Sequence, residues 1–201
     1  MITKEEEAKQ RAALYEMLSI AFYPPKPDVE TFWGEVLSKF ADEKDISVTV
    51  KALDLRLEYN RLFVGPRTLP CPPYESVYRE DREPDERGTL MGPSVWDVKK
   101  RYSEAGLAIS KDFKDYPDHV AVELEFMDFL CSRESFATAE KKEEERALWQ
   151  SREKEFLESH IRKWTGVFSE KVLKSTDSPF YRTAASFLKE HVNDELEYFS
   201  E

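Results

Sequence analysis

The chain has 201 residues, enough to bury the core of one domain and too few for two full-sized domains. Hydrophobic residues make up 40% of it, with 13 Phe, 9 Tyr and 4 Trp, and charged residues make up 35%, which excludes a disordered chain and indicates a globular domain with an aromatic core. Its formal net charge of -11 would repel nucleic acid and attract a basic peptide, unless the acidic excess only keeps the protein dissolved.

The pattern of apolar residues predicts an all-α fold. The whole chain contains 6 glycines, and no segment alternates strictly between polar and apolar residues. A first helix is predicted up to Pro24-Pro25, with an apolar stripe formed by Leu14, Met17, Leu18, Ala21 and Phe22. Asp28 is expected to cap a second helix that reaches Phe40.

A third helix, from about Val48 to Phe63, leads into a proline-rich segment. Six prolines lie between residues 64 and 93, so this stretch is predicted to be a long loop, with ordered ends and a charged, loose middle at 79–87. Loops of this length in compact domains are often functional.

Start and stop signals outline the remaining helices. One helix is expected from Ser94 to Gly106 and another from Asp118 to about Arg133. Two more are expected near the end of the chain. The first has the apolar stripe Leu157, Ile161, Trp164 and Phe168, and the second begins at Ser178-Pro179 and has the apolar stripe Phe180, Ala184, Phe187, Leu188 and His191. The charged run at 139–146 is expected to be a solvated helix start or a connector. The sequence therefore predicts one domain over residues 1–201, a compact bundle of about seven or more helices with the long loop at 64–93.

The predicted helix from His119 carries acids on two faces. At about 100° per residue, one polar face gathers Glu125, Asp128 and Ser132. Glu123 falls on the apolar arc, where a charged carboxylate needs a partner. That partner is either internal, namely His119 or an arginine from another helix, or a bound peptide that reaches a polar floor formed by Asp118, His119 and Glu123.

Motifs for catalysis and metal binding are missing from the sequence. There is no Gly-rich phosphate loop, GxSxG or HExxH motif. His119 and Glu123 have the spacing of two ligands on one helix, but no second histidine lies near them in the sequence, so we expect no metal and no cofactor. Cys71 and Cys131 form no CxxC pair, and Cys71 lies in a stiff proline segment. We therefore expect a protein that is not an enzyme.

Three separated blocks of sequence resemble one known family. They are EYNRLFVGP at 58–66, PPYESVY at 72–78 and MGP at 91–93, followed downstream by the pair Asp118-His119 and VAVELEFM. Together they are similar to the central block and the Asp-His signature of the TorD/DmsD/NarJ chaperones. The likeness is strongest from Glu58 to about Leu130. The chain departs from the family's motif at Lys114 and Tyr116, where the family has Glu and Pro.

The resemblance implies a chaperone that binds the N-terminal twin-arginine signal, or a remnant of it, of a molybdopterin-dependent oxidoreductase precursor until its cofactor has been inserted. Two arginines followed by an apolar segment need an apolar groove with acids at one end. The residues expected to bind the peptide are Leu62, Phe63, Pro73, Tyr74, Glu75, Tyr78, Asp118, His119 and Glu123. Leu62 and Phe63 could equally be core residues of the third helix.

Two other functions stay open at this point: a nucleotide-binding or nucleotide-hydrolysing regulator, and a permanent assembly subunit of a redox complex. The N-terminal residues are charged and lack the apolar run that a signal peptide needs, and no stretch approaches the ~20 apolar residues of a membrane span. We expect a cytoplasmic protein without stable membrane insertion, present as a monomer or a homodimer, with no nucleic-acid partner.

Overall fold

The computed structural model describes residues 2–26, 52–65, 68–79, 90–111 and 113–200, and these residues form helices and connectors without a strand. The long helices are α1 (Lys4–Phe22), α5 (Pro93–Glu104), α6 (Val120–Ala139), α7 (Glu143–Phe156), α8 (Arg162–Ser175) and α9 (Pro179–Tyr198). The shorter ones are α3 (Ala52–Tyr59), α4 (Glu75–Tyr78) and the π-helical turns η1 (Asn60–Val64) and η2 (Leu157–Ile161). The predicted all-α class is confirmed.

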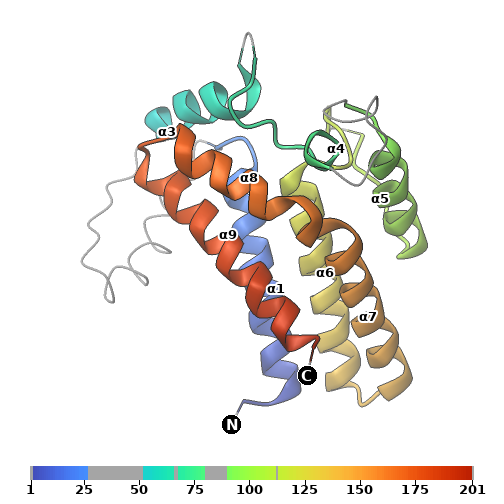
Figure 1. Cartoon of the computed structure of the whole chain (residues 1–201). Coiled ribbons are helices and arrows are strands. Elements are labelled where there is room, and N and C mark those ends of the chain that lie inside the picture. The colour runs from blue at the N-terminus through green and yellow to red at the C-terminus, as the bar shows by residue number, and fades with distance from the viewer. Residues whose placement is uncertain (1, 27–51, 66–67, 80–89, 112, 201) are drawn as a thin grey trace.

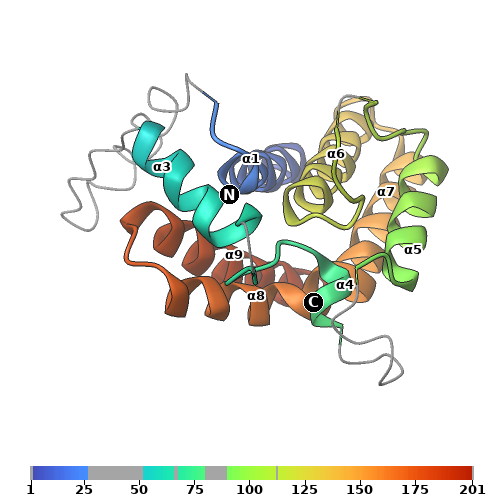
Figure 2. The ribbon, with the colours of Figure 1, turned by 90° about the horizontal axis from the view of Figure 1, so that it is seen from above.

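Five long helices make the body of the bundle. α1 packs along α6, α6 against α7, and α8 against α9, so that α6 lies between α1 and α7 (Figure 1). Seen from above, α3 and α5 lie on opposite sides of this body (Figure 2). The core between the helices is aromatic, as expected, and its largest fully buried side chains include Tyr15, Phe22, Phe156, Trp164, Phe168 and Tyr181.

The ends of several helices follow local chemistry. Thr3 and Glu6 form a capping box at the start of α1, in which each side chain satisfies a backbone N–H of the other residue. Gly106 has φ 81, the left-handed conformation that follows a helix end, as the sequence predicts. Ser178 and Pro179 begin α9 as predicted, although the Ser178 side chain forms no capping hydrogen bond.

Other predicted details are corrected. In α1 the buried stripe runs through Arg11 and Tyr15, and Leu14 is only half-buried. α5 begins at Pro93 with Gly92 as its N-cap, so Ser94 lies inside the helix. The predicted loop at 64–93 contains the short helix α4. The predicted second helix and most of the charged middle of that loop lie outside the described residues.

The start of α6 is also corrected by one residue. His119, rather than Asp118, is the N-cap, because its Nδ1 accepts a hydrogen bond of 3.1 Å from the backbone N–H of Ala121. α6 also continues to Ala139, beyond the predicted end near Arg133. The charged run that follows contains both the surface connector from α6 and the exposed first turn of α7, so it is a connector and a helix start.

Candidate functional site

Backbone pairing fixes the proline-rich segment to the start of α6. The N–H of Glu75 donates to the carbonyl of Asp118 at 3.0 Å, and the N–H of Val120 donates to the carbonyl of Pro73 at 2.8 Å. Tyr74 and His119 form an isolated antiparallel bridge between these two bonds. The structure therefore brings the PPYESVY block and the Asp-His pair together, although they are more than 40 residues apart in the sequence.

The side chain of Asp118 is hydrogen-bonded to the backbone of α4. Its Oδ2 accepts a hydrogen bond of 2.8 Å from the backbone N–H of Ser76 in the first turn of α4. Burial raises the pKa of this carboxyl group, and the hydrogen bonds from Ser76 partly oppose that shift. The role of Asp118 in the structure is thus to anchor α4, and this engagement explains why it does not cap α6.

Glu75 is fully buried, and both of its carboxylate oxygens have polar partners. The side chain of Arg79 pairs with its Oε1, and the Nδ1 atom of His160 lies 2.9 Å from its Oε2. The other ring nitrogen of His160 lies 3.0 Å from Oδ2 of Asp97 in α5. These contacts connect α4, α5 and η2.

Glu123 has a partner that the sequence did not indicate. Its Oε2 accepts a hydrogen bond of 3.0 Å from the indole N–H of Trp164 in α8, so neither His119 nor an arginine is its partner. Burial, with the nearby charges of Glu75 and Asp118, raises the pKa of Glu123 well above its usual value. Burial and the neighbouring carboxyl groups therefore favour the protonated form of Glu123.

The nine residues expected to bind a peptide fall into two places. Leu62 and Phe63 are buried in the core, where the Phe63 ring packs against Phe22 and Phe168. The others gather around α4 and the start of α6: Pro73, Tyr74, Glu75, Tyr78, Asp118, His119 and Glu123. Of the nine, Tyr74 alone is not buried, and its hydroxyl donates to Asp115 at 2.8 Å.

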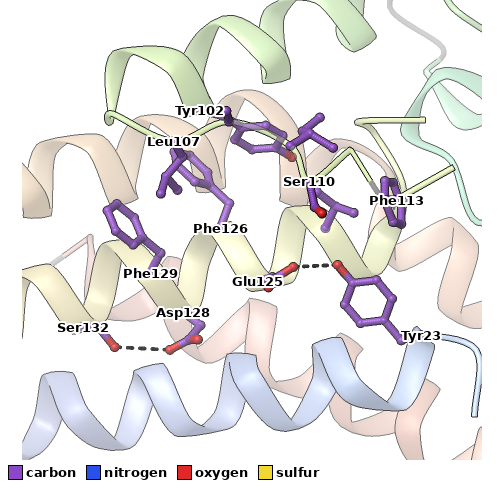
Figure 3. Close-up of a pocket in the computed structure, with 13 residues that line it drawn as sticks. Tyr23, Tyr102, Leu107, Ser110, Phe113, Glu125, Phe126, Asp128, Phe129 and Ser132 are labelled. Atoms are coloured by element: carbon purple, nitrogen blue, oxygen red, sulfur yellow. Dashed lines mark hydrogen bonds between the residues drawn. The ribbon is translucent and has the colours of Figure 1, made fainter. Parts of the chain in front are cut away.

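A cavity of about 690 Å³ lies beside this cluster, between α6 and the segment that follows α5 (Figure 3). Its lining consists of Tyr23, Tyr102, Leu107, Ala108, Ile109, Ser110, Phe113, Val122, Glu125, Phe126, Asp128, Phe129 and Ser132. We call this cavity the α6 groove. It adjoins the predicted site, because the rings of Tyr23 and Phe113 lie 6.3 and 6.2 Å from the ring of His119.

The α6 groove has an apolar side and an acidic side. Phe126 and Phe129 point toward the segment after α5, which contributes Leu107, whereas Asp128 points toward α1 (Figure 3). On the acidic side, Tyr23 donates a hydrogen bond of 2.6 Å to Glu125. The size of the groove and its mixed lining match those of sites that bind a small molecule or a few peptide side chains.

Asp128 occupies an unusual environment within the α6 groove. Burial, together with the charges of Glu16 and Glu125, raises its pKa to about 6, while a hydrogen bond from Ser132 opposes the shift. Ser132 donates to Oδ1 of Asp128 at 3.3 Å. Asp128 is therefore ionised at pH 7, at a cost that a bound cation would reduce.

The polar residues of the α6 groove were not assigned a role from the sequence. Glu125, Asp128 and Ser132 do share the polar face that helical spacing predicts. What the sequence does not show is that the segment after α5 lines the same cavity as this face, through Leu107, Ala108, Ile109, Ser110 and Phe113, because that segment has no helical or strand pattern. A polar face beside the aromatic residues Phe126 and Phe129 was the available signal.

The described residues provide no site for a metal ion formed by three or more His, Cys, Asp or Glu side chains. Within the same part of the chain, no helix is long and apolar enough to cross a membrane. Burial raises the pKa of both cysteine thiols, Cys71 and Cys131, which disfavours the reactive thiolate form.

Comparisons with known proteins identify relatives over much of the chain. The sequence profile described as nitrate reductase delta subunit matches residues 26–170. A TorD chaperone from Vibrio parahaemolyticus is 26% identical over 163 residues, which are 81% of this chain and 69% of the relative. A selenate reductase assembly chaperone from Thauera selenatis is 33% identical over 107 residues, 52% of this chain and 51% of the relative.

A solved structure agrees with the fold. The crystal structure of a protein described as a redox enzyme maturation protein from Archaeoglobus fulgidus has a TM-score of 0.63 to this chain and covers 91% of it and 93% of its own chain, at 22% identity. The relatives are chaperones or maturation proteins, not catalysts. Because the profile spans more than half of the sequence, the chain belongs to the nitrate reductase delta subunit family, which includes the TorD and NarJ maturation chaperones.

Proposed function

We propose that this maturation chaperone binds the N-terminal twin-arginine signal, or a remnant of it, of a molybdopterin-dependent oxidoreductase precursor. Binding takes place in the cytoplasm and holds the precursor until its cofactor has been inserted. The relatives support a reductase as the client, since two of them are named assembly chaperones of selenate reductase and chlorate reductase.

The observation that carries this proposal is the α6 groove. A twin-arginine signal combines cationic side chains with an apolar segment, so its receptor needs an apolar surface next to unneutralised acids. The α6 groove has both within one cavity, and it opens beside the Asp-His pair that carries the family resemblance. Large aromatic side chains suit the binding of a flexible segment, because ordering them costs little entropy.

The predicted peptide-binding residues have a supporting part in this proposal. Tyr74 and His119 do not line the α6 groove but lie next to it, because the rings of Tyr23 and Phe113, which line it, pack near the ring of His119. A peptide longer than the cavity would extend toward them and α4. Asp118 and Glu75 hold α4 at that end through buried contacts. Direct contact between a peptide and the buried acids would require α4 to move away from α6.

The test is a titration of a fluorescent twin-arginine signal peptide against the purified protein. We expect saturable binding, with a dissociation constant on the order of micromolar. Ile109→Ala removes a half-buried side chain from the apolar side of the α6 groove and should weaken binding about tenfold, because the contact area of one aliphatic side chain is lost.

Leu148→Ala is the matched control, since Leu148 is an exposed aliphatic residue on α7 that does not line the α6 groove. It should leave the affinity unchanged. Absence of saturable binding by the wild-type protein would refute the proposed function. Equal affinities of the Ile109→Ala and Leu148→Ala variants would place the peptide elsewhere on the molecule.

A further inference from the structure

The acidic side of the α6 groove carries negative charge that no cation in the described residues neutralises. Three carboxylates contribute to it: Asp128 and Glu125 on α6, and Glu16 on α1, whose charge raises the pKa of Asp128. Over the described ranges, no Lys, Arg or His side chain forms an ion pair with any of the three. The buried Glu75 differs, because it is paired with Arg79. The uncompensated charge therefore faces the α6 groove.

The two acids that line the α6 groove are held in place by neutral donors. Tyr23 donates to Oε2 of Glu125, and Ser132 donates to Oδ1 of Asp128. Each contact fixes the position of a carboxylate without reducing its charge. Asp128 and Glu125 are three residues apart on α6, the spacing at which helical side chains are neighbours. A bound group can therefore reach both of them.

We propose that Asp128 and Glu125 form a subsite for one arginine side chain of the bound peptide. This inference rests on the proposed function and names the part of the signal that the acidic side of the α6 groove recognises. A guanidinium group presents five N–H donors in a rigid fork, so it can bridge two carboxylates, which a lysine ammonium cannot do in the same planar geometry.

The position of the subsite also orients the peptide. The aromatic ring of Tyr23, beside Glu125, offers a face on which a guanidinium plane can stack. The apolar residues that follow the arginine in the peptide then cross α6 toward Phe126, Phe129 and Leu107 on the opposite side of the cavity. The arginine thus lies next to α1 and the apolar segment next to the residues after α5.

A double-mutant cycle tests the subsite. The wild-type protein and Asp128→Asn, which keeps the shape and removes the charge, are titrated with the signal peptide and with peptides in which each arginine in turn is replaced by Gln or by Lys. Asp128→Asn should weaken binding of the intact peptide about tenfold. It should weaken binding of one of the two Gln peptides, the one that lacks the recognised arginine, by less than about twofold. The Lys peptide should lie between them.

Two further variants complete the experiment. Glu144→Gln removes an exposed acid at the start of α7 and should bind every peptide as the wild-type protein does. Asp128→Arg should recover binding of the peptide that carries Glu in place of the recognised arginine, which loss of the native fold could not produce. This recovery would support the subsite.

The outcomes separate the two proposals. If Asp128→Asn weakens the intact and the Gln peptides by the same factor at both arginine positions, the subsite is refuted while the proposed function stands. If the wild-type protein binds no signal peptide at all, the proposed function itself is refuted, and the subsite with it.

Discussion

Neighbouring acids on one helix have different chemistry because the helix turns between them. Glu123 faces the core, where burial favours its protonated form, and it accepts a hydrogen bond from Trp164. Glu125 lies two residues further along, at the surface, and accepts from Tyr23. Asp128 is intermediate, because it lies in the α6 groove with its pKa raised to about 6. Burial thus decides which of the three can attract a cation at neutral pH.

The raised pKa of Asp128 predicts how peptide affinity depends on pH. The ionised carboxylate is the form that attracts an arginine, so affinity should be constant above about pH 7 and should fall as the pH drops through about 6. Between pH 7.5 and pH 5 the loss should be about tenfold, measured by the same fluorescence titration in buffers of equal ionic strength.

The control for this pH dependence is Asp128→Asn, whose affinity should vary much less over the same range. His119 should not contribute, because burial lowers its pKa to about 4 and it stays neutral throughout. A wild-type affinity that does not change between pH 7.5 and pH 5 would contradict the assignment of Asp128 to the binding site.

At the scale of elements, local chemistry predicted most of the helices. The Ser178-Pro179 start of α9 and the Gly106 stop after α5 depend only on nearby residues, so the sequence predicts them correctly. The start of α6 was misplaced by one residue, because Asp118 is engaged by Ser76, which is 42 residues away. Contacts across such distances leave no periodic pattern in the sequence.

The candidate site was predicted in part for the same reason. The sequence motifs predicted that the region around Tyr74 and the Asp-His pair belong to the site, and backbone hydrogen bonds do join the two segments. The sequence could not show that most of these side chains are buried, nor that residues 107–110 and Phe113 line one cavity with α6. Both facts depend on packing between elements that are separated along the chain.

The N-cap of α6 gives a prediction at this scale. His119→Ala removes the acceptor for the N–H of Ala121, whereas His119→Asn keeps a side-chain acceptor at the cap while losing the ring. The Ala variant should therefore be less stable than the Asn variant by about 1 kcal/mol, measured by urea denaturation at pH 7. Equal stabilities would show that the cap bond contributes nothing.

Ser178→Ala at the start of α9 is the matched control. Ser178 occupies the same N-cap position, but its side chain forms no capping hydrogen bond. Its replacement should change the free energy of unfolding by no more than about 0.5 kcal/mol. If Ser178→Ala lowers the free energy of unfolding as much as His119→Ala does, the capping hydrogen bond does not determine how much an N-cap side chain contributes to stability.

At the scale of the whole molecule, one buried arginine connects four helices. Arg11 in α1 donates to Glu195 in α9 and to Glu153 in α7 at 2.7 Å, and to Glu134 in α6 at 3.0 Å. One positive charge cannot neutralise three carboxylates, and burial raises the pKa of Glu153 to about 8, so this group keeps a proton at pH 7. Because α6 is one of the four helices, this cluster also holds the helix that carries the α6 groove.

Replacing this arginine should therefore destabilise the entire bundle. Arg11→Met keeps an apolar stem of similar length but leaves buried carboxylates without a cation, a change that costs about 3–5 kcal/mol. For a chain of this size the melting temperature should fall by about 10 °C or more, measured by circular dichroism at pH 7.

The pH dependence of the Arg11→Met variant distinguishes lost charge compensation from lost packing. Burial already raises the pKa values of Glu134 and Glu153, and without Arg11 they rise further above those in the unfolded chain, so the folded state holds more protons than the unfolded state. Stability of the variant should consequently fall as the pH rises, and its deficit relative to the wild-type protein should be smaller at pH 5 than at pH 8. Lys9→Met, which removes an exposed cation of the same helix, is the control and should change the melting temperature little at either pH. If the stability deficit of Arg11→Met is the same at pH 5 and pH 8, the loss is due to packing alone.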